Sequence, residues 1–124
     1  MFKVPISNGE LIDKITILKI KEKKIMKDDK LKHIKNELTE LNVYLNILLE
    51  KFDLHHLITE LENVNLKLWD LEDKIRIKDK KNEFDQEFIQ IAKLIYQNND
   101  IRCTIKFNIN KLTNSFLVEV KSYE

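Results

Sequence analysis

Lysine supplies all but two of the 22 basic side chains in this sequence, and the two exceptions are Arg76 and Arg102. A guanidinium group presents five donors in a planar fork that fits a carboxylate or a phosphate, and a lysine ammonium does not reproduce that geometry. In a chain that otherwise uses lysine, an arginine indicates a position that needs the fork. Both arginines fall on the apolar face of a predicted helix, so they mark either a functional or a structural centre.

Other polar residues share the helix faces of the two arginines. Asn65, Trp69, Glu72 and Arg76 are spaced by four, three and four residues, which places them on one line along a helix. Glu72 also precedes Arg76 by four residues, the favourable order for an ion pair on a helix. Together with acids and amides near Arg102 and near the start of the chain, they form our set of candidate ligand-binding residues: Glu10, Asp13, Lys14, Asn65, Trp69, Glu72, Arg76, Asn99, Asp100, Arg102 and Lys106.

Charged groups on a packing face must pair or reach water, and this requirement leaves two interpretations of the set. The structural interpretation is a buried ion network that fixes the register of the helices. The functional interpretation is a polar pocket in a helical bundle, a common place for ligand sites. In such a pocket Arg76, Arg102 and Lys106 would hold an anion, with Lys14 as a further cation. Glu72 or Asp13 would be the candidate acid or base.

Composition limits the class of protein. A chain of 124 residues has room for one domain with a core, and we expect a single domain over residues 1–124. The net charge of +1 provides no basic field, so we expect no nucleic-acid partner. We find neither an apolar run of membrane-spanning length nor a signal segment, and Cys103 is the only cysteine. These features predict a protein of the reducing cytoplasm, without a membrane span.

The scarcity of turn residues predicts a helical fold. One glycine and one proline favour long helices with short polar links. The fold class that we expect is all-α, an antiparallel bundle of about four helices with a short extended C-terminal tail. Apolar periodicity predicts the helices from Asn8 to Lys27, Lys30 to Glu50, Leu54 to Asp79 and Glu83 to Asn110, with the tail from Thr113 to Glu124. Because no glycine or proline separates the second helix from the third, one long bent helix is an alternative.

The first predicted helix is apolar on two sides. Ile17 and Ile20 lie on the side of Asp13, while Leu11 and Ile15 belong to the opposite, broader face. A helix with two apolar sides is packed on both, so we expect this helix to be central in the bundle.

Capping residues predict where the helices begin. Ser7 is a good N-cap, and Glu10 three residues later completes a capping box. Asp28 or Asp29 would cap the second helix, and Asp53 the third.

The only proline and the only glycine, Pro5 and Gly9, both lie at the start of the first helix. A helix N-terminus with a glycine favours a bound anion, but Glu10 and Asp13 oppose one there. We therefore favour a plain helix cap.

Four stretches of the chain carry a family resemblance: Val4 to Leu18, Leu68 to Arg76, Ala92 to Asn110 and Glu119 to Tyr123. They resemble a family of small bacterial proteins catalogued only as a domain of unknown function. The resemblance covers essentially the whole chain, although residues 28–61 match by pattern only. It implies an accessory role in lipopolysaccharide or other surface-glycan synthesis, because genes for such proteins often lie near genes of that synthesis. The motifs coincide with the candidate residues, which places the pocket on an equal footing with the structural ion network.

Three functions remain compatible with the sequence. The first, which we favour, is a helical interaction module that associates with itself as a homodimer or with another protein, because apolar arcs on the first and fourth helices leave surface for a partner. It predicts internally paired arginines and no cavity among them. The second is a binder or enzyme for a small anionic metabolite, namely a sugar phosphate, a nucleotide sugar or a dicarboxylate. It predicts a solvent-connected pocket lined by the candidate residues.

The third function is metal-dependent nucleotide pyrophosphohydrolysis, which needs converging carboxylates. Glu37 and Glu40 are the paired acids that suggest it. Glu40 projects away from the apolar seam of its helix, toward solvent, which weakens a carboxylate metal site. We therefore expect no bound metal and no cofactor.

Overall fold

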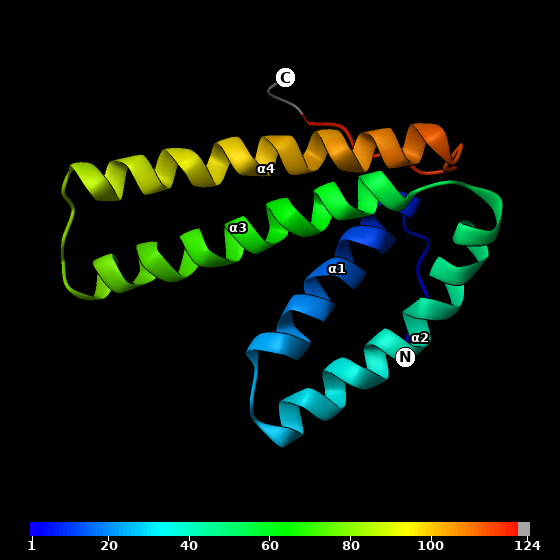
Figure 1. Cartoon of the computed structure of the whole chain (residues 1–124), viewed down its shortest axis with the longest axis horizontal. Helices are drawn as coiled ribbons and strands as arrows, with labels where there is room; N and C mark the ends of the chain where they lie inside the picture. Colours follow the sequence, from blue (N-terminus) through cyan, green and yellow to red (C-terminus); the bar gives the residue numbers. More distant parts are fainter. Residues whose placement is uncertain (122–124) are drawn as a thin grey trace.

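The apolar stripes of the sequence form four helices packed as a bundle (Figure 1). The structure, a computed structural model, describes residues 1–121, and no strand occurs in that range. The helices are α1 (Asn8–Lys24), α2 (Asp28–Lys51), α3 (His55–Lys80) and α4 (Gln86–Leu112). The predicted all-α fold class is confirmed. The alternative of one long bent helix is wrong, because α2 and α3 are separate helices.

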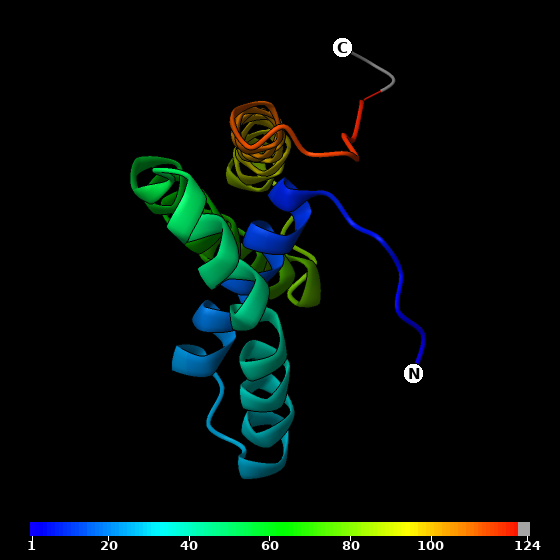
Figure 2. The ribbon, with the colours of Figure 1, turned by 90° about the vertical axis from the view of Figure 1, so that its right-hand side faces the viewer.

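The helices form two antiparallel hairpins that meet at one end and diverge at the other (Figures 1 and 2). One hairpin is α1 with α2, and the second is α3 with α4. Helix α1 packs against all three other helices, whereas within residues 1–121 α2 packs closely only against α1. The central position predicted for the first helix is confirmed, and its two apolar sides face α2 and the α3/α4 hairpin.

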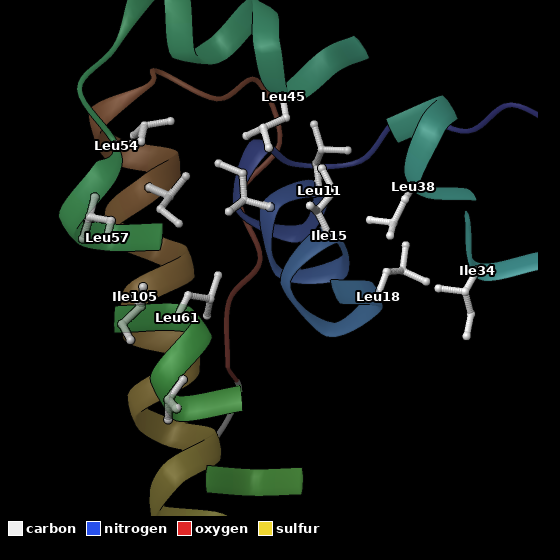
Figure 3. Close-up of a cluster of buried hydrophobic side chains, with 13 residues drawn as sticks. Leu11, Ile15, Leu18, Ile34, Leu38, Leu45, Leu54, Leu57, Leu61 and Ile105 are labelled. Carbon is white, nitrogen blue, oxygen red and sulfur yellow. The ribbon is translucent and has the colours of Figure 1, made fainter. Parts of the chain in front are cut away.

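The hydrophobic core lies where the two hairpins meet (Figure 3). Fully burying one leucine or isoleucine side chain stabilises the fold by about 1.5–3 kcal/mol, so this end of the molecule carries most of the apolar stabilisation. No helix within the described range is both long and apolar enough to cross a bilayer. The core includes Leu11, Ile15 and Leu18 of α1, Ile34, Leu38 and Leu45 of α2, Leu54, Leu57, Leu61 and Val64 around α3, and Ile105 and Ile109 of α4.

Helix boundaries differ from the predictions by a few residues. Helix α1 ends at Lys24 because Ile25 already has extended backbone angles. Helix α4 begins at Gln86, since the carboxylate of Asp85 caps it by accepting from the Phe88 amide at 2.9 Å. The fourth predicted helix therefore started three residues too early.

Two of the predicted caps are also displaced. Lys27 is the N-cap of α2, without a side-chain hydrogen bond, and Asp28 and Asp29 lie in the first turn instead. There they face the positive end of the helix dipole. Leu54 is the N-cap of α3, while Asp53 accepts a long hydrogen bond of 3.4 Å from a backbone amide in the first turn.

Two asparagines end helices where glycine would be usual. Asn82 and Asn114 have φ angles of 54° and 56°, in the left-handed region. The amides beyond them turn back to helix carbonyls, from Glu83 to Lys78 at 2.9 Å and from Ser115 to Asn110 at 2.8 Å. This is the Schellman pattern of helix termination, and it explains how α3 and α4 end without a glycine.

Gly9 sets the approach of α1 to α4. A Cβ atom at Gly9 would lie 2.5 Å from the carbonyl oxygen of Lys106, so only glycine fits there without moving a backbone. The Gly9 amide donates to Asn110 Oδ1 at 2.6 Å, and the Glu10 amide donates to the cap Ser7 Oγ at 3.0 Å. The predicted cap at Ser7 is confirmed, and these amides already have acceptors in the protein. The Glu10 carboxylate pairs with Lys106 rather than returning to the cap.

The chain after α4 forms an arm, residues 113–121, which turns at Thr113 and Asn114 and then runs without regular secondary structure beside that helix (Figure 2). Glu119 accepts hydrogen bonds from Ser7 Oγ at 2.5 Å and from Asn110 Nδ2 at 3.2 Å. Lys121 pairs with Asp100 of α4. The arm therefore ties the start of α1 to α4. The remainder of the predicted tail, with the Ser122 and Tyr123 of the last motif, lies outside the described residues.

Candidate functional site

A buried ion pair joins α1 to α4 where the hairpins begin to diverge. Arg102 donates from Nε to Asp13 Oδ1 at 2.9 Å and from Nη2 to Asp13 Oδ2 at 2.5 Å. The Asp13 side chain is 1% exposed and that of Arg102 is 27% exposed. Two parallel bonds to one carboxylate are the strongest arrangement a guanidinium makes, and one that lysine cannot supply. The bonds to Asp13 raise the pKa of Arg102, although burial acts in the opposite direction.

Two further residues complete this polar network across three helices. Asn65 of α3 donates from Nδ2 to Asp13 Oδ1 at 2.9 Å and to Thr16 Oγ1 at 2.8 Å. Thr16 donates to the backbone oxygen of Asp13 at 2.7 Å. No buried side-chain nitrogen or oxygen within the described range lacks a partner. The network is therefore closed, as the structural interpretation of the sequence required.

An open cleft of about 410 Å³ begins at the outer side of this network. It lies between α1 and the α3/α4 hairpin, and its volume is within the range of small-ligand sites. The arginines pair internally, as the interaction-module hypothesis predicted. A cavity also opens among them, as the metabolite-binding hypothesis predicted. Its lining contains six of the candidate residues, Asn65, Trp69, Glu72, Arg76, Asn99 and Arg102, together with Ile17, Leu68 and Asp73.

The two arginines reach the cleft from different surroundings. Arg102 projects from the buried network, and its third nitrogen, Nη1, makes only a long contact of 3.4 Å with Asn99 Oδ1. Arg76 is 75% exposed, and its Nε lies 3.5 Å from Glu72 Oε2. The prediction that Arg76 occupies a packing face is wrong, because its side chain is mostly exposed. Helix α1 diverges from α3 toward the C-terminal end of α3 (Figure 1).

The other candidate residues do not line the cleft. Asp13 lies behind Arg102 with both carboxylate oxygens engaged, which leaves Glu72 as the candidate acid or base that faces the cleft. Three ion pairs hold the rest elsewhere: Glu10 with Lys106 at 2.6 Å, Lys14 with Glu37 of α2 at 3.1 Å, and Asp100 with Lys121 of the arm.

Sequence reasoning missed two polar residues of this region. Thr16 follows Asp13 by three residues on the same face of α1, so the spacing contained a signal for it. Asp73 follows Glu72 directly and therefore projects from α3 in a different direction, away from the line of candidate residues. No sequence pattern distinguished it from a surface residue, although it lines the cleft.

The described residues contain no group of three or more His, Cys, Asp or Glu side chains arranged to hold a metal ion. Glu37, one of the paired acids considered for a metal site, forms its ion pair with Lys14. The pyrophosphohydrolase alternative therefore gains no support from this geometry.

The fold and the cleft define a small all-helical module in which α1 is clamped to a longer helical hairpin. Residues 2–124 match the model of a family of unknown function, DUF6165, and the chain belongs to that family. The resemblance drawn from the motifs is confirmed to this extent. No curated protein and no solved structure shows a significant match to the chain. Since the family description names no activity, a role has to be argued from the site.

Proposed function

We propose that the protein binds a small hydroxylated anion, such as a sugar phosphate or a nucleotide sugar, in the cleft between α1 and the α3/α4 hairpin. One observation carries this proposal: the cleft brings together the only two arginines and the only tryptophan of the chain. They come from two different helices, so only the folded protein assembles them.

The two guanidinium groups supply complementary kinds of anion contact. Arg102 is held in place by Asp13, so its outer edge is ordered before a ligand arrives, which lowers the entropic cost of binding. Arg76 has one weak surface partner, worth at most about 0.5 kcal/mol, and can turn toward a phosphate at little cost. Phosphate is a group that arginine binds through two parallel hydrogen bonds.

The remaining lining favours a ligand that carries hydroxyl groups. Glu72 and Asp73 are acceptors when ionised, so each needs a donor such as a sugar hydroxyl. The half-buried Trp69 offers an apolar ring face for the carbon skeleton of the sugar. An ionised dicarboxylate only accepts hydrogen bonds, so it has no donor to offer Glu72 and Asp73. We therefore favour the sugar phosphate and the nucleotide sugar over the dicarboxylate.

The resemblance to proteins encoded near surface-glycan genes supports the same ligand class. Synthesis of such glycans uses phosphorylated and nucleotide-linked sugars, and an accessory protein that binds one of them would fit there. This role is a proposal about binding and assigns no reaction to the cleft.

Titration followed by the fluorescence of Trp69 tests the proposal directly, because the chain has a single tryptophan. The panel is a hexose 1-phosphate, a uridine diphosphate hexose, the free hexose, inorganic phosphate and succinate. We expect a phosphorylated sugar to bind more tightly than the free hexose, phosphate or succinate. Arg76→Gln should weaken that binding at least about tenfold. The matched control is Lys74→Gln, which removes one positive charge from the exposed part of α3 outside the cleft and should change affinity less than about twofold.

Two results would overturn the proposal. One is an absence of binding for every phosphorylated sugar. The other is an unchanged affinity in Arg76→Gln, because the cleft would then not be where the ligand sits.

A second candidate function is self-association as an interaction module. It is favoured by large apolar side chains that stay exposed on α4, among them Ile89, Tyr96 and Phe107. Binding in the cleft and self-association use different faces of α4, so one protein can have both.

A further inference from the structure

A second apolar line runs along α4 on a side that the core does not use. Its members are Ile89, Ala92, Tyr96, Cys103 and Phe107, at spacings that keep them on one side of a helix. Ile89, Tyr96 and Phe107 are 45%, 57% and 47% exposed. A stripe of this kind on a helix indicates a second packing surface in addition to the one that faces α3.

A hollow lies at the C-terminal half of this stripe, between α4 and the arm. Its volume is about 240 Å³, and its apolar lining is formed by Cys103, Phe107 and Val120. Lys106, Glu119 and Lys121 stand at its polar rim, and the Glu119 carboxylate already accepts from Ser7 and Asn110. The stripe therefore has a protruding isoleucine near one end and an apolar recess near the other.

The protrusion and the recess are related by symmetry. Ile89 and Phe107 lie at equal distances along α4 on either side of the level of Asn98, and Ala92 and Cys103 are related in nearly the same way. A two-fold axis across α4 at that level would make the helices of two copies antiparallel. It would bring Ile89 of each copy to the hollow of the other and set the small Ala92 against the small Cys103. A surface that matches itself in this way is what a closed dimer requires.

Charge and area fit the same arrangement. Lys93 and Asp100 flank the stripe on one side, and reversal of the second helix would add Lys93 of one copy to the ion pair that Asp100 of the other makes with its own Lys121. A half-exposed aromatic side chain offers roughly 100 Å² of surface. With Tyr96, Phe107, Ile89 and Val120 from both copies, the contact reaches on the order of 1,000 Å², where specific interfaces begin.

We infer that two copies of the chain associate through antiparallel α4 helices, with Ile89 of each copy seated in the hollow beside Phe107 and Val120 of the other. This inference specifies the surface for the self-association proposed as the second candidate function, and it rests on that proposal. It does not depend on a ligand in the cleft.

Light scattering of the full chain tests the assembly first. At about 50 µM chain, a concentration suited to an interface of this size, the wild type should have twice the mass of a 14.9 kDa chain. Ile89→Lys should have the mass of one chain, because the new ammonium would have to leave water for an apolar hollow that already has Lys106 and Lys121 at its rim. The matched control is Ile77→Lys, on an isoleucine of α3 that is 52% exposed and outside the stripe; it should remain a dimer.

Disulfide trapping tests the antiparallel register. Ala92→Cys, with the natural Cys103 retained, should give a covalent dimer under mild oxidation. The two positions cannot bridge within one chain, because they lie about 16 Å apart along α4 and a disulfide needs Cα atoms closer than about 7 Å. Two controls should stay uncrosslinked: Ala92→Cys combined with Cys103→Ser, and Gln90→Cys, which points away from the stripe.

The outcomes separate the interface from self-association in general. A wild type with the mass of one chain overturns both. A dimer that survives Ile89→Lys, or that crosslinks as well through Gln90→Cys, overturns this interface and leaves self-association through another surface.

Discussion

The two arginine pairs have the same chemistry in two different surroundings. Arg102 meets Asp13 under the cover of three helices, with two bonds of 2.9 and 2.5 Å. Arg76 meets Glu72 on one helix, at 3.5 Å and open to solvent. The covered pair clamps the hairpins together, while the open pair has a guanidinium that remains available to a ligand.

The path of α1 explains this difference. Near its start, α1 lies close to α4 because Gly9 permits it, and there its polar face is sealed against α3 and α4. Toward its end α1 departs from the α3/α4 hairpin (Figure 1), and the cleft lined by Trp69 and Arg76 lies between them. One helix therefore makes a closed region for stability and an open region for binding.

The largest predicted effect comes from removing the acid of the covered pair. Asp13→Ala leaves Arg102 without its carboxylate partner and Asn65 with Thr16 as its remaining acceptor, so we expect a loss of about 3 kcal/mol in the free energy of unfolding. Glu72→Ala removes the acid of the open pair and should change the free energy of unfolding by less than about 0.5 kcal/mol. Urea denaturation of both variants measures the comparison, and equal losses would contradict it.

A methyl group at Gly9 should have the next largest effect. Gly9→Ala places a Cβ atom 2.5 Å from the Lys106 carbonyl oxygen and must push α1 from α4. We expect a loss of about 2 kcal/mol, measured by urea denaturation. Lys23→Ala, at an exposed position of the same helix, is the control and should lose almost nothing. A stable Gly9→Ala protein would show that the close approach is not needed.

Conservative replacement of the two arginines should give smaller and unequal effects. Arg102→Lys keeps the charge but loses one of the two bonds to Asp13, for an expected cost of about 1–2 kcal/mol. Arg76→Lys should melt within about 1 °C of the wild type, because its pair is exposed. Differential scanning fluorimetry measures the melting temperature of both variants. An equal fall in melting temperature for Arg76→Lys and Arg102→Lys would contradict the comparison.

The smallest predicted effect is a pH dependence of the C-terminal arm. Burial raises the pKa of Glu119, but the Ser7 hydrogen bond, backbone hydrogen bonding, Lys106 and Asn110 outweigh it, so the pKa lies below its ordinary 4.5. The arm's contact is thus present above pH 4.5 and lost as the pH falls through the lowered pKa. Hydrogen exchange at residues 113–121 should accelerate on acidification, whereas in Glu119→Gln the rates should no longer respond beyond the ordinary chemical effect of pH. If the exchange rates of Glu119→Gln still respond to pH in this way, a group other than Glu119 causes the response.

The sequence predicted the helices and the central place of α1 because those properties are local. Apolar spacing determines which face of a helix avoids water, and α1 has two such faces. The helix stops at Asn82 and Asn114 were harder to place, since asparagine takes the left-handed conformation less often than glycine and leaves a weaker signal.

The candidate site was predicted as a set of residues but not as a geometry. The line from Asn65 to Arg76 follows from helix periodicity alone. Whether a residue on that line is buried depends on where α1 covers it, which follows from a contact between Gly9 and the backbone of α4. Contacts between distant parts of a chain leave no periodic pattern, so Arg76 and Arg102 looked equivalent in sequence.

The pairing of Asp13 with Arg102 also has a consequence for synthesis of the protein. A ribosome adds about 5–20 residues per second, so Asp13 leaves the ribosome several seconds before its partner exists. Until α4 emerges, α1 has neither Asn110 nor Arg102 to bind, and it can pack only against α2 and then against α3. We expect the α1/α2 hairpin to wait as a loosely formed intermediate that the arrival of α4 completes.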